Sequence, residues 1–228
     1  MALLEVKDLC YSCADGDCRK VIYDNASASF DSGRFYAVTG ESGSGKTTLL
    51  YIIAGLEKEY EGEVLFKGEM IKDTDLTGYR RDHVSMIYQN YNLIPYLSPI
   101  ENIEVALDIT DNDTDKNSEH IMQLLARLGI DKRAAVRRAS LLSGGEQQRV
   151  AIGRAVATGC EIIIADEPTG NLDVHTAEQV IGLFRDLAHN EGKCVIMVTH
   201  NERFAEVADE WLYIDQENKK IVSKRTNE

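Results

Sequence analysis

The sequence predicts an α/β fold in which helices cover a mainly parallel sheet. An apolar run at 35–39 is followed by a glycine-rich loop and then by apolar residues at helical spacing. Strand and helix patterns alternate again between 159 and 228, whereas 90–158 carries mainly helical patterns. Strands that alternate with helices form parallel sheets with both faces covered. We therefore expect a single domain, 1–228, with a core of about 1–89 and 159–228 and a helical subdomain inserted at about 90–158.

The first third of the chain also predicts an antiparallel β subdomain. Residues 3–13 and 20–39 read as strands joined by a polar turn, and 62–66 and 70–71 form a second strand pair around Lys67-Gly68. An apolar run at 84–88 and an amphipathic helix ended by Gly129 follow. Next come a buried strand at 162–165, a helix with one apolar face at 180–187 and a second buried strand at 194–199. The last predicted element is a terminal hairpin formed by 211–214 and 221–222.

Charge and hydropathy restrict the function. The net charge of −13 argues against a nucleic-acid partner, because a phosphate backbone needs a basic footprint. No apolar run is long enough to span a bilayer, and no signal-peptide pattern opens the sequence. We expect a cytosolic protein that another subunit would have to hold at a membrane.

The segment Gly40–Thr48 reads GESGSGKTT and matches the pattern G-x-x-x-x-G-K-[ST] between a predicted strand and a predicted helix. In that context the backbone N–H groups and the helix N-terminus bind phosphate oxygens. Lys46 would reach the β- and γ-phosphates, and the Thr47 hydroxyl would bind Mg²⁺. The residues expected at the nucleotide are Gly40, Glu41, Ser42, Gly43, Ser44, Gly45, Lys46, Thr47 and Thr48.

Two carboxylates follow the strand predicted at 162–165. Asp166 and Glu167 stand where a parallel sheet presents side chains to a nucleotide. Asp166 would orient Mg²⁺ or its water, the acidic element that phosphoryl transfer needs. Glu167 would accept a proton from an attacking water.

A second anion site is predicted at Leu142–Gln148, which reads LSGGEQQ. Ser143 can cap a helix, and Gly144 and Gly145 keep its N-terminus free of side chains. Two phosphate-binding helix ends in one small domain suggest that each serves a different nucleotide, so we expect two copies of the chain to face each other.

The segment 90–104 combines Pro95 and Pro99 with four apolar residues, Leu93, Ile94, Tyr96 and Leu97. Prolines this close prevent a regular helix across the whole segment. Two interpretations stay open: a partly buried loop, or an exposed apolar patch for a partner.

The combination of 40–48, Gln89, LSGGEQQ at 142–148, the run IIIADEPTGNLD ending at Asp173, and His200 resembles the nucleotide-binding domain of an ATP-binding-cassette (ABC) transporter. The resemblance covers essentially the whole chain. The run from Asp166 to Asp173 is similar to a narrower branch, which holds lipoprotein-release, macrolide-export and antimicrobial-peptide-resistance ATPases.

The resemblance implies further roles. Gln89 would sense Mg²⁺ and the membrane partner, and Asp173 would link two ATP sites across a dimer. His200 would contact the γ-phosphate and position water. Family members usually stack an aromatic residue on adenine four residues after the leucine that matches Leu9, where this chain has Cys13.

Tyr11 offers a replacement for that ring, because positions 11 and 13 point to the same side of a strand. Ordinary strand packing of Tyr11 is the alternative.

The resemblance implies an ATPase that hydrolyses Mg²⁺·ATP in a head-to-tail dimer. It would drive export or extraction of a peptide, lipoprotein or drug-like substrate through a membrane permease, at the cytoplasmic face of the membrane. One alternative is an ATPase of the same branch that gates a cell-envelope enzyme or sensor without transport. Another is a soluble ABC ATPase acting on DNA or ribosomes, which the acidic charge disfavours.

Overall fold

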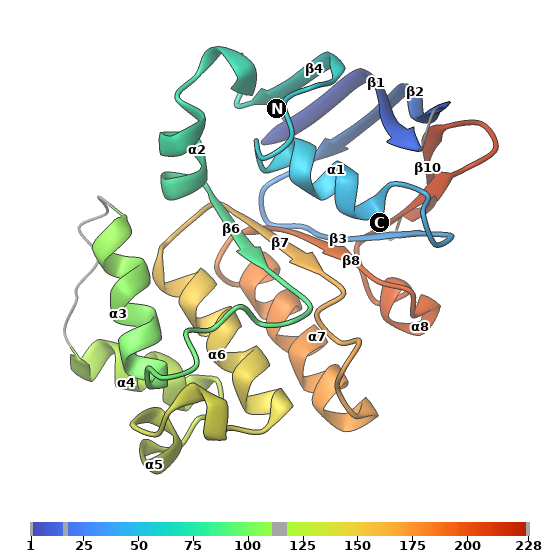
Figure 1. Cartoon of the computed structure of the whole chain (residues 1–228). Coiled ribbons are helices and arrows are strands. Elements are labelled where there is room, and N and C mark those ends of the chain that lie inside the picture. Colours follow the sequence, from blue (N-terminus) through green and yellow to red (C-terminus); the bar gives the residue numbers. More distant parts are fainter. Residues whose placement is uncertain (1, 16–17, 111–117, 227–228) are drawn as a thin grey trace.

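A computed structural model of the chain describes residues 2–15, 18–110 and 118–226. Two sheets lie one above the other (Figure 1). The smaller sheet is antiparallel and has the order β2-β1-β4-β5. Its strands are β1 (Leu4–Asp15), β2 (Cys18–Phe30), β4 (Glu61–Phe66) and β5 (Glu69–Met70). Lys67 and Gly68 form the predicted tight turn, with φ of 51° and 84°.

The larger sheet has six strands in the order β10-β9-β3-β8-β7-β6. It contains β3 (Phe35–Gly40), β6 (Val84–Ile87), β7 (Ile162–Asp166), β8 (Cys194–Val198), β9 (Glu210–Asp215) and β10 (Lys220–Thr226). All neighbours pair in parallel except β9 and β10, which form the predicted terminal hairpin. The predicted fold class is confirmed.

The strand predicted at 20–39 is divided. A turn at 31–34, with Gly33 at φ 75°, separates β2 from β3. The chain thereby crosses from the antiparallel sheet to the parallel sheet. At the start of β3 the backbone N–H of Phe35 donates to Asp209 Oδ2 at 2.7 Å.

Alternate residues of the central strand β3 enter two hydrophobic cores. Phe35 and Ala37 pack with α6 (Gly144–Ala157) and α7 (Val174–His189) on one face of the parallel sheet. Tyr36 and Val38 pack with α1 (Lys46–Ile53) and with the strands of the antiparallel sheet on the other face. Figure 1 shows α6 and α7 below the sheet and α1 above it. The strand is fully covered, as its apolar run requires.

Helix α1 begins directly after the glycine-rich loop. Leu49, Ile52 and Ile53 are buried as predicted, but Leu56 is 46% exposed. The helix ends at Ile53, and Gly55 takes a positive φ of 67°, so the chain turns before Leu56 can continue the apolar face.

The middle of the chain is helical. It contains α3 (Pro99–Ile109), α4 (Ser118–Arg127), α5 (Lys132–Ala135) and the 3₁₀ turn η2 (Ala139–Leu141). Helix α4 with its Gly129 end is confirmed, but α3 was not predicted. Pro99 is the first residue of α3, where a missing N–H costs nothing, and Ser98 with Glu101 forms a capping box.

Helices of this middle segment share one hydrophobic cluster with the parallel sheet. Ile103 of α3, Leu125 of α4 and Val150 of α6 lie in the same cluster as Ile163 and Val195 of the sheet. The bounds of a separate helical subdomain at 90–158 therefore stay a prediction. None of the helices in the described part of the chain has the length and apolar character needed to cross a lipid bilayer.

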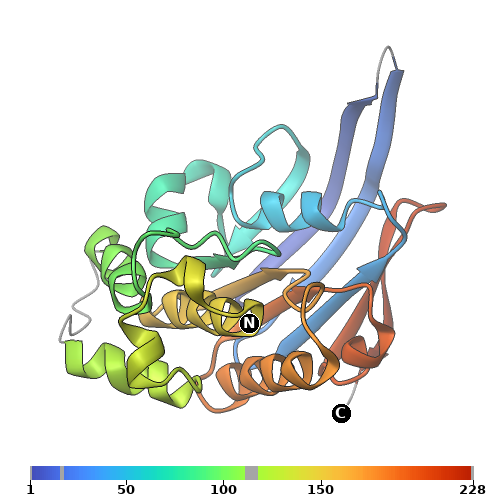
Figure 2. The ribbon, with the colours of Figure 1, turned by 60° about the horizontal axis from the view of Figure 1, so that its bottom comes forward.

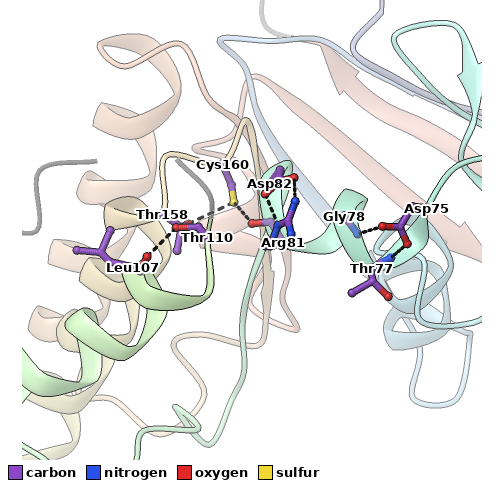
Figure 3. A network of polar contacts seen from close by, with 9 residues as sticks. All are labelled: Asp75, Thr77, Gly78, Arg81, Asp82, Leu107, Thr110, Thr158 and Cys160. Carbon is purple, nitrogen blue, oxygen red and sulfur yellow. Dashed lines mark hydrogen bonds and ion pairs between the residues drawn. The ribbon is translucent and has the colours of Figure 1, made fainter. Parts of the chain in front are cut away.

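Short helical elements connect the two sheets. The chain passes from β5 through η1 (Ile71–Asp73) and α2 (Leu76–Asp82) into β6, and α8 (Glu202–Ala205) follows β8. Asp75 caps α2 by accepting from the backbone N–H groups of Thr77 and Gly78 (Figure 3). At the other end of α2, the thiol of Cys160 donates to the carbonyl of Arg81 at 3.8 Å. These contacts fix α2 beside the start of β7.

Candidate nucleotide-binding site

The glycine-rich loop lies between the end of β3 and the start of α1 and packs against β2. Gly45 has φ 105°, and a Cβ at this position would lie 2.3 Å from Cγ2 of Ile22, so only glycine fits. The Tyr23 hydroxyl donates to the Gly45 carbonyl at 2.9 Å. Burial raises the pKa of Tyr23, which keeps the phenol neutral as a donor. Tyr23 was not predicted as a support for this loop.

The Lys46 side chain folds back onto the loop and binds its backbone. Its Nζ donates to the carbonyls of Gly40 at 3.0 Å and Glu41 at 2.8 Å, and the residue is 6% exposed. Burial lowers the pKa of Lys46, while the nearby carboxylates of Glu167 and Asp166 oppose that shift. A buried ammonium beside free backbone N–H groups is a strong anion site.

Thr47 and Asp166 approach each other from different elements. The Thr47 hydroxyl donates to Asp166 Oδ2 at 3.1 Å. The other oxygen, Oδ1, is buried and has no partner among the described residues. Burial raises the pKa of Asp166, the Thr47 hydrogen bond opposes the shift, and Glu167 adds to it. A hydroxyl and an unsatisfied carboxylate oxygen form a donor set that fits a hard divalent cation such as Mg²⁺.

Glu167 and His200 form the polar end of the site. Glu167 Oε1 lies 2.6 Å from His200 Nε2. Glu167 has a positive φ of 47°, which is unusual for a residue with a side chain. Its backbone N–H donates to the Val198 carbonyl at 3.0 Å, so the neighbouring strand holds this conformation. Strained backbone of this kind is often found at functional sites.

Gln89 reaches the same place from the end of β6. Its Nε2 lies 3.3 Å from the position that a Cβ would take at Gly170. Glu167 Oε2 lies 3.9 Å from that position. Gly170 thus leaves room for the amide of Gln89 to approach Glu167, as expected if both residues serve one site.

A pocket of about 470 Å³ unites most of these residues. Eight of the residues predicted from the sequence line it: Ser42, Gly43, Gly45, Lys46, Thr47, Thr48, Glu167 and His200. The remaining walls come from Cys13 and Ala14 of β1 and from Lys20 and Ile22 of β2. Lys20 and Ile22 were missed, because only the pairing of β1 with β2 brings them over the loop.

Tyr11 lies outside this pocket. Its hydroxyl donates to Glu57 Oε2 at 3.1 Å, and its side chain lines a separate pocket of about 510 Å³ with Lys58 and Tyr60. Burial, followed by the Glu57 contact, raises the pKa of Tyr11. Cys13, at the position where the family usually has an aromatic residue, borders the phosphate loop, and the stacking of Tyr11 on adenine stays a prediction.

The LSGGEQQ segment begins α6 as predicted. Ser143 accepts from the N–H of Glu146, and Glu146 accepts in return from Ser143, which makes a capping box. A Cβ at Gly145 would lie 2.6 Å from Cγ2 of Thr176, and Thr176 also binds Asp173 through its N–H and its hydroxyl. Asp173 caps α7 in this way.

The start of α6 and Asp173 are therefore neighbours. None of Ser143, Gly144, Gly145 and Asp173 is among the described residues that line the pocket around Lys46. Within one chain the two predicted anion sites remain separate.

Comparison with known proteins gives a consistent assignment. Residues 23–170 match the family model for ABC transporters. The uncharacterized ABC transporter ATP-binding protein YclH of Bacillus subtilis is 42% identical over 188 residues, which cover 82% of this chain and 83% of YclH. The lipoprotein-releasing system ATP-binding protein LolD of Idiomarina loihiensis is 36% identical, covering 90% of this chain and 91% of LolD.

The solved dimer of the ATP-binding cassette MJ0796 of Methanocaldococcus jannaschii, bound to ADP and Pi in a post-hydrolysis state, superposes with a TM-score of 0.87. It is 32% identical, and the match covers 99% of each chain. The similarity to LolD confirms the predicted branch, and the alternatives without transport are not favoured. The chain belongs to the ABC transporter family, in which it is an ATP-binding subunit that hydrolyses ATP.

Proposed function

We propose that this subunit hydrolyses Mg²⁺·ATP in a head-to-tail dimer and thereby drives export or extraction of a substrate through an integral membrane permease. One observation carries the proposal: Lys46, Thr47, Glu167 and His200 line one pocket, and Asp166 accepts a hydrogen bond from Thr47. The substrate class follows the branch that the sequence resembles: a peptide, a lipoprotein or a drug-like molecule. The name of LolD, a lipoprotein-releasing system, supports the second of these.

In this mechanism Lys46 and the loop N–H groups bind the β- and γ-phosphates. Thr47, Asp166 and Gln89 would hold Mg²⁺, which when bound neutralises charge on the phosphates. Glu167 accepts the proton of the attacking water on a carboxylate oxygen. His200, 2.6 Å from that carboxylate, orients it and faces the γ-phosphate.

The dimer follows from the separation of the two anion sites. Ser143 is exposed, and the first residues of α6 do not line the pocket around Lys46. A second copy, rotated head to tail, would place Ser143, Gly144 and Gly145 against the γ-phosphate bound at Lys46. Asp173 lies next to this segment and would join the two sites. The dimer of MJ0796 supports this arrangement.

The permease would dock on an apolar surface beside Gln89. Of the four apolar residues predicted there, Tyr96 is 69% exposed, whereas Leu93, Ile94 and Leu97 are partly buried. Leu141, 61% exposed, is adjacent, because the N–H of Ser140 donates to the Pro95 carbonyl at 3.1 Å.

Leu93 packs against the core cluster, so it supports the loop and does not serve as an anchor. Leu93 thus fits the interpretation as a partly buried loop, and the exposure of Tyr96 supports the proposal of a partner surface. Docking at Tyr96 would place the subunit at the cytoplasmic face of the membrane, within reach of Gln89.

The catalytic part of the proposal predicts the behaviour of Glu167→Gln. This variant should bind Mg²⁺·ATP but hydrolyse it about 10²–10⁴-fold more slowly, the range for loss of a general base. ATP should then accumulate the closed dimer, which size-exclusion chromatography detects. Adding Lys46→Ala should abolish that dimer. Hydrolysis near the wild-type rate in Glu167→Gln would assign the base to another residue.

A further inference from the structure

Lys20 reaches over the phosphate loop from the β1–β2 ribbon, the long pair of strands in Figure 2. It is the cross-strand partner of Cys13, and both side chains line the pocket that contains Lys46. The Nζ of Lys20 lies 3.9 Å from the position that a Cβ would take at Gly43. Lys20 and Lys46 are the two lysines among the described residues that line this pocket.

The ammonium of Lys20 has free hydrogen-bonding capacity. Within the described part of the chain, Lys20 forms no hydrogen bond and no ion pair, although the chain carries a net charge of −13. Other lysines near the sheets are engaged: Lys46 binds two carbonyls and Lys67 binds Glu161. An ammonium provides three donors and no acceptor, so an anion in the pocket is the matching ligand for Lys20.

The same pocket offers no large ring to a nucleobase. No Phe, Tyr or Trp is among the described residues that line it, and Cys13 and Ala14 form its wall on β1. Tyr11 is committed to Glu57 in the neighbouring pocket. Stacking on an aromatic side chain is a major source of affinity for a base, and the described residues that line this pocket do not provide it.

We propose that Lys20 is a nucleotide-binding residue that donates to the phosphate chain, so that its charge strengthens the binding of a nucleoside triphosphate whatever its base. The inference rests on the proposed nucleotide site and adds to it a phosphate contact from β2. The charge of Lys20 replaces part of the affinity that a stacked ring would provide.

The test measures dissociation constants of non-hydrolysable ATP and GTP analogues with the full chain. Lys20→Gln should raise both constants by a similar factor, about threefold to tenfold, as expected for one partly solvated charge-assisted hydrogen bond. Lys20→Arg should retain most of the affinity, and the effect of Lys20→Gln should shrink at high salt.

Arg19→Gln is the matched control, because it removes the same charge one residue away, on a side chain that lines the other pocket. It should leave both constants unchanged. Unchanged binding in Lys20→Gln, or weaker binding of only one of the two analogues, overturns the inference.

Lys46→Ala distinguishes a failure of the Lys20 proposal from a failure of the proposed nucleotide site. If Lys46→Ala abolishes binding while Lys20→Gln does not weaken it, the proposed function stands and the role of Lys20 is rejected. If neither variant changes binding, the nucleotide site itself is wrongly placed. Melting temperatures of all variants show whether each one is folded.

Discussion

At the scale of a single residue, Asp166 shows how the proposed catalytic site lowers the stability of the fold. One of its oxygens is buried with no partner among the described residues, and its carboxylate lies near that of Glu167. Burial and Glu167 both raise the pKa of Asp166, so the charged form is disfavoured where the reaction requires it. The proposed role in binding Mg²⁺ explains why the group is present, because an uncharged side chain of the same shape would suit the fold better.

Asp166→Asn is therefore expected to stabilise the protein and to inactivate it. The neutral amide removes the repulsion with Glu167 and can still accept the Thr47 hydrogen bond. Without added metal, the melting temperature should rise by roughly 2–4 °C, equivalent to about 1 kcal/mol in a domain of this size. Calorimetry checks the rise, and hydrolysis measured across a Mg²⁺ titration checks the loss. A lower melting temperature would show that the carboxylate stabilises the fold.

Residues that belong to a continuous motif could be assigned to the proposed site from the sequence alone. The loop from Gly40 to Thr48 and the pair Asp166 and Glu167 could be placed because a strand end and a helix start fix their backbone. The sequence did not show that Tyr11 and Cys13 line different pockets. Both pack on the same core cluster, but two residues advance about 6–7 Å along a strand, which puts them in different pockets.

Lys20 and Tyr23 belong to β2, and irregular pairing places them at the loop. Register shifts interrupt the β1–β2 ladder between Val6 and Ser12. Bulges of this kind change which residues face each other and are not visible in a pattern of alternating side chains. The sequence therefore indicated a strand but not its register.

At the scale of single elements, the two capping boxes of the helical part make a matched pair. Ser98 with Glu101 begins α3, and Ser143 with Glu146 begins α6. In each, the serine N–H and hydroxyl both donate to the glutamate, at 2.7 to 2.8 Å. Only the α6 box lies at the proposed dimer interface.

Ser98→Ala and Ser143→Ala should thus lower stability alike and differ in function. Loss of an N-cap costs about 1 kcal/mol, which denaturant unfolding measures in both. In the Glu167→Gln background, Ser143→Ala should also reduce the ATP-dependent dimer, whereas Ser98→Ala should not. Equal dimer formation in the two variants would remove Ser143 from the interface.

Helix α3 was not predicted, because a proline can either interrupt a helix or begin one. Pro99 seemed to interrupt a regular helix, yet it begins α3. Proline fixes φ near the helical value and lacks only an N–H that has no partner in the first turn. The serine before it and the glutamate two residues after it were the available signs of a helix start.

At the scale of the whole molecule, the exposed pair Tyr96 and Leu141 should couple the ATPase to the membrane. Tyr96→Asp should leave the isolated subunit folded and able to bind ATP, since the side chain is 69% exposed. It should prevent assembly with the permease, because an apolar contact that buries a charge is costly. Val222→Asp, at an exposed site on the far hairpin, is the control.

Co-purification of tagged subunits with their permease from detergent-solubilised membranes measures this effect. Normal assembly of Tyr96→Asp would place the docking surface elsewhere. Leu93→Asp differs in kind: Leu93 packs against the core, so this variant should lower the melting temperature of the subunit alone.

The sequence also predicted the parallel sheet without its strand order. Phe35 pairs with Val195, and Tyr36 pairs with both Ile196 and Glu210. Pairings between such distant segments depend on the whole fold, and strand patterns contain no information about which neighbours meet.

The position of β3 between β8 and β9 has a consequence for biosynthesis. All four strands of the antiparallel sheet precede Ile71, so that sheet has its complete set of partners early in translation. The strand that presents the phosphate loop leaves the ribosome long before either of its neighbours, because both belong to the last quarter of the chain. Domains grow from the N-terminus during synthesis. A nascent chain therefore carries the whole GESGSGKTT segment for most of its translation without the parallel sheet that shapes it. We expect ATP binding only after the final strands have been synthesised.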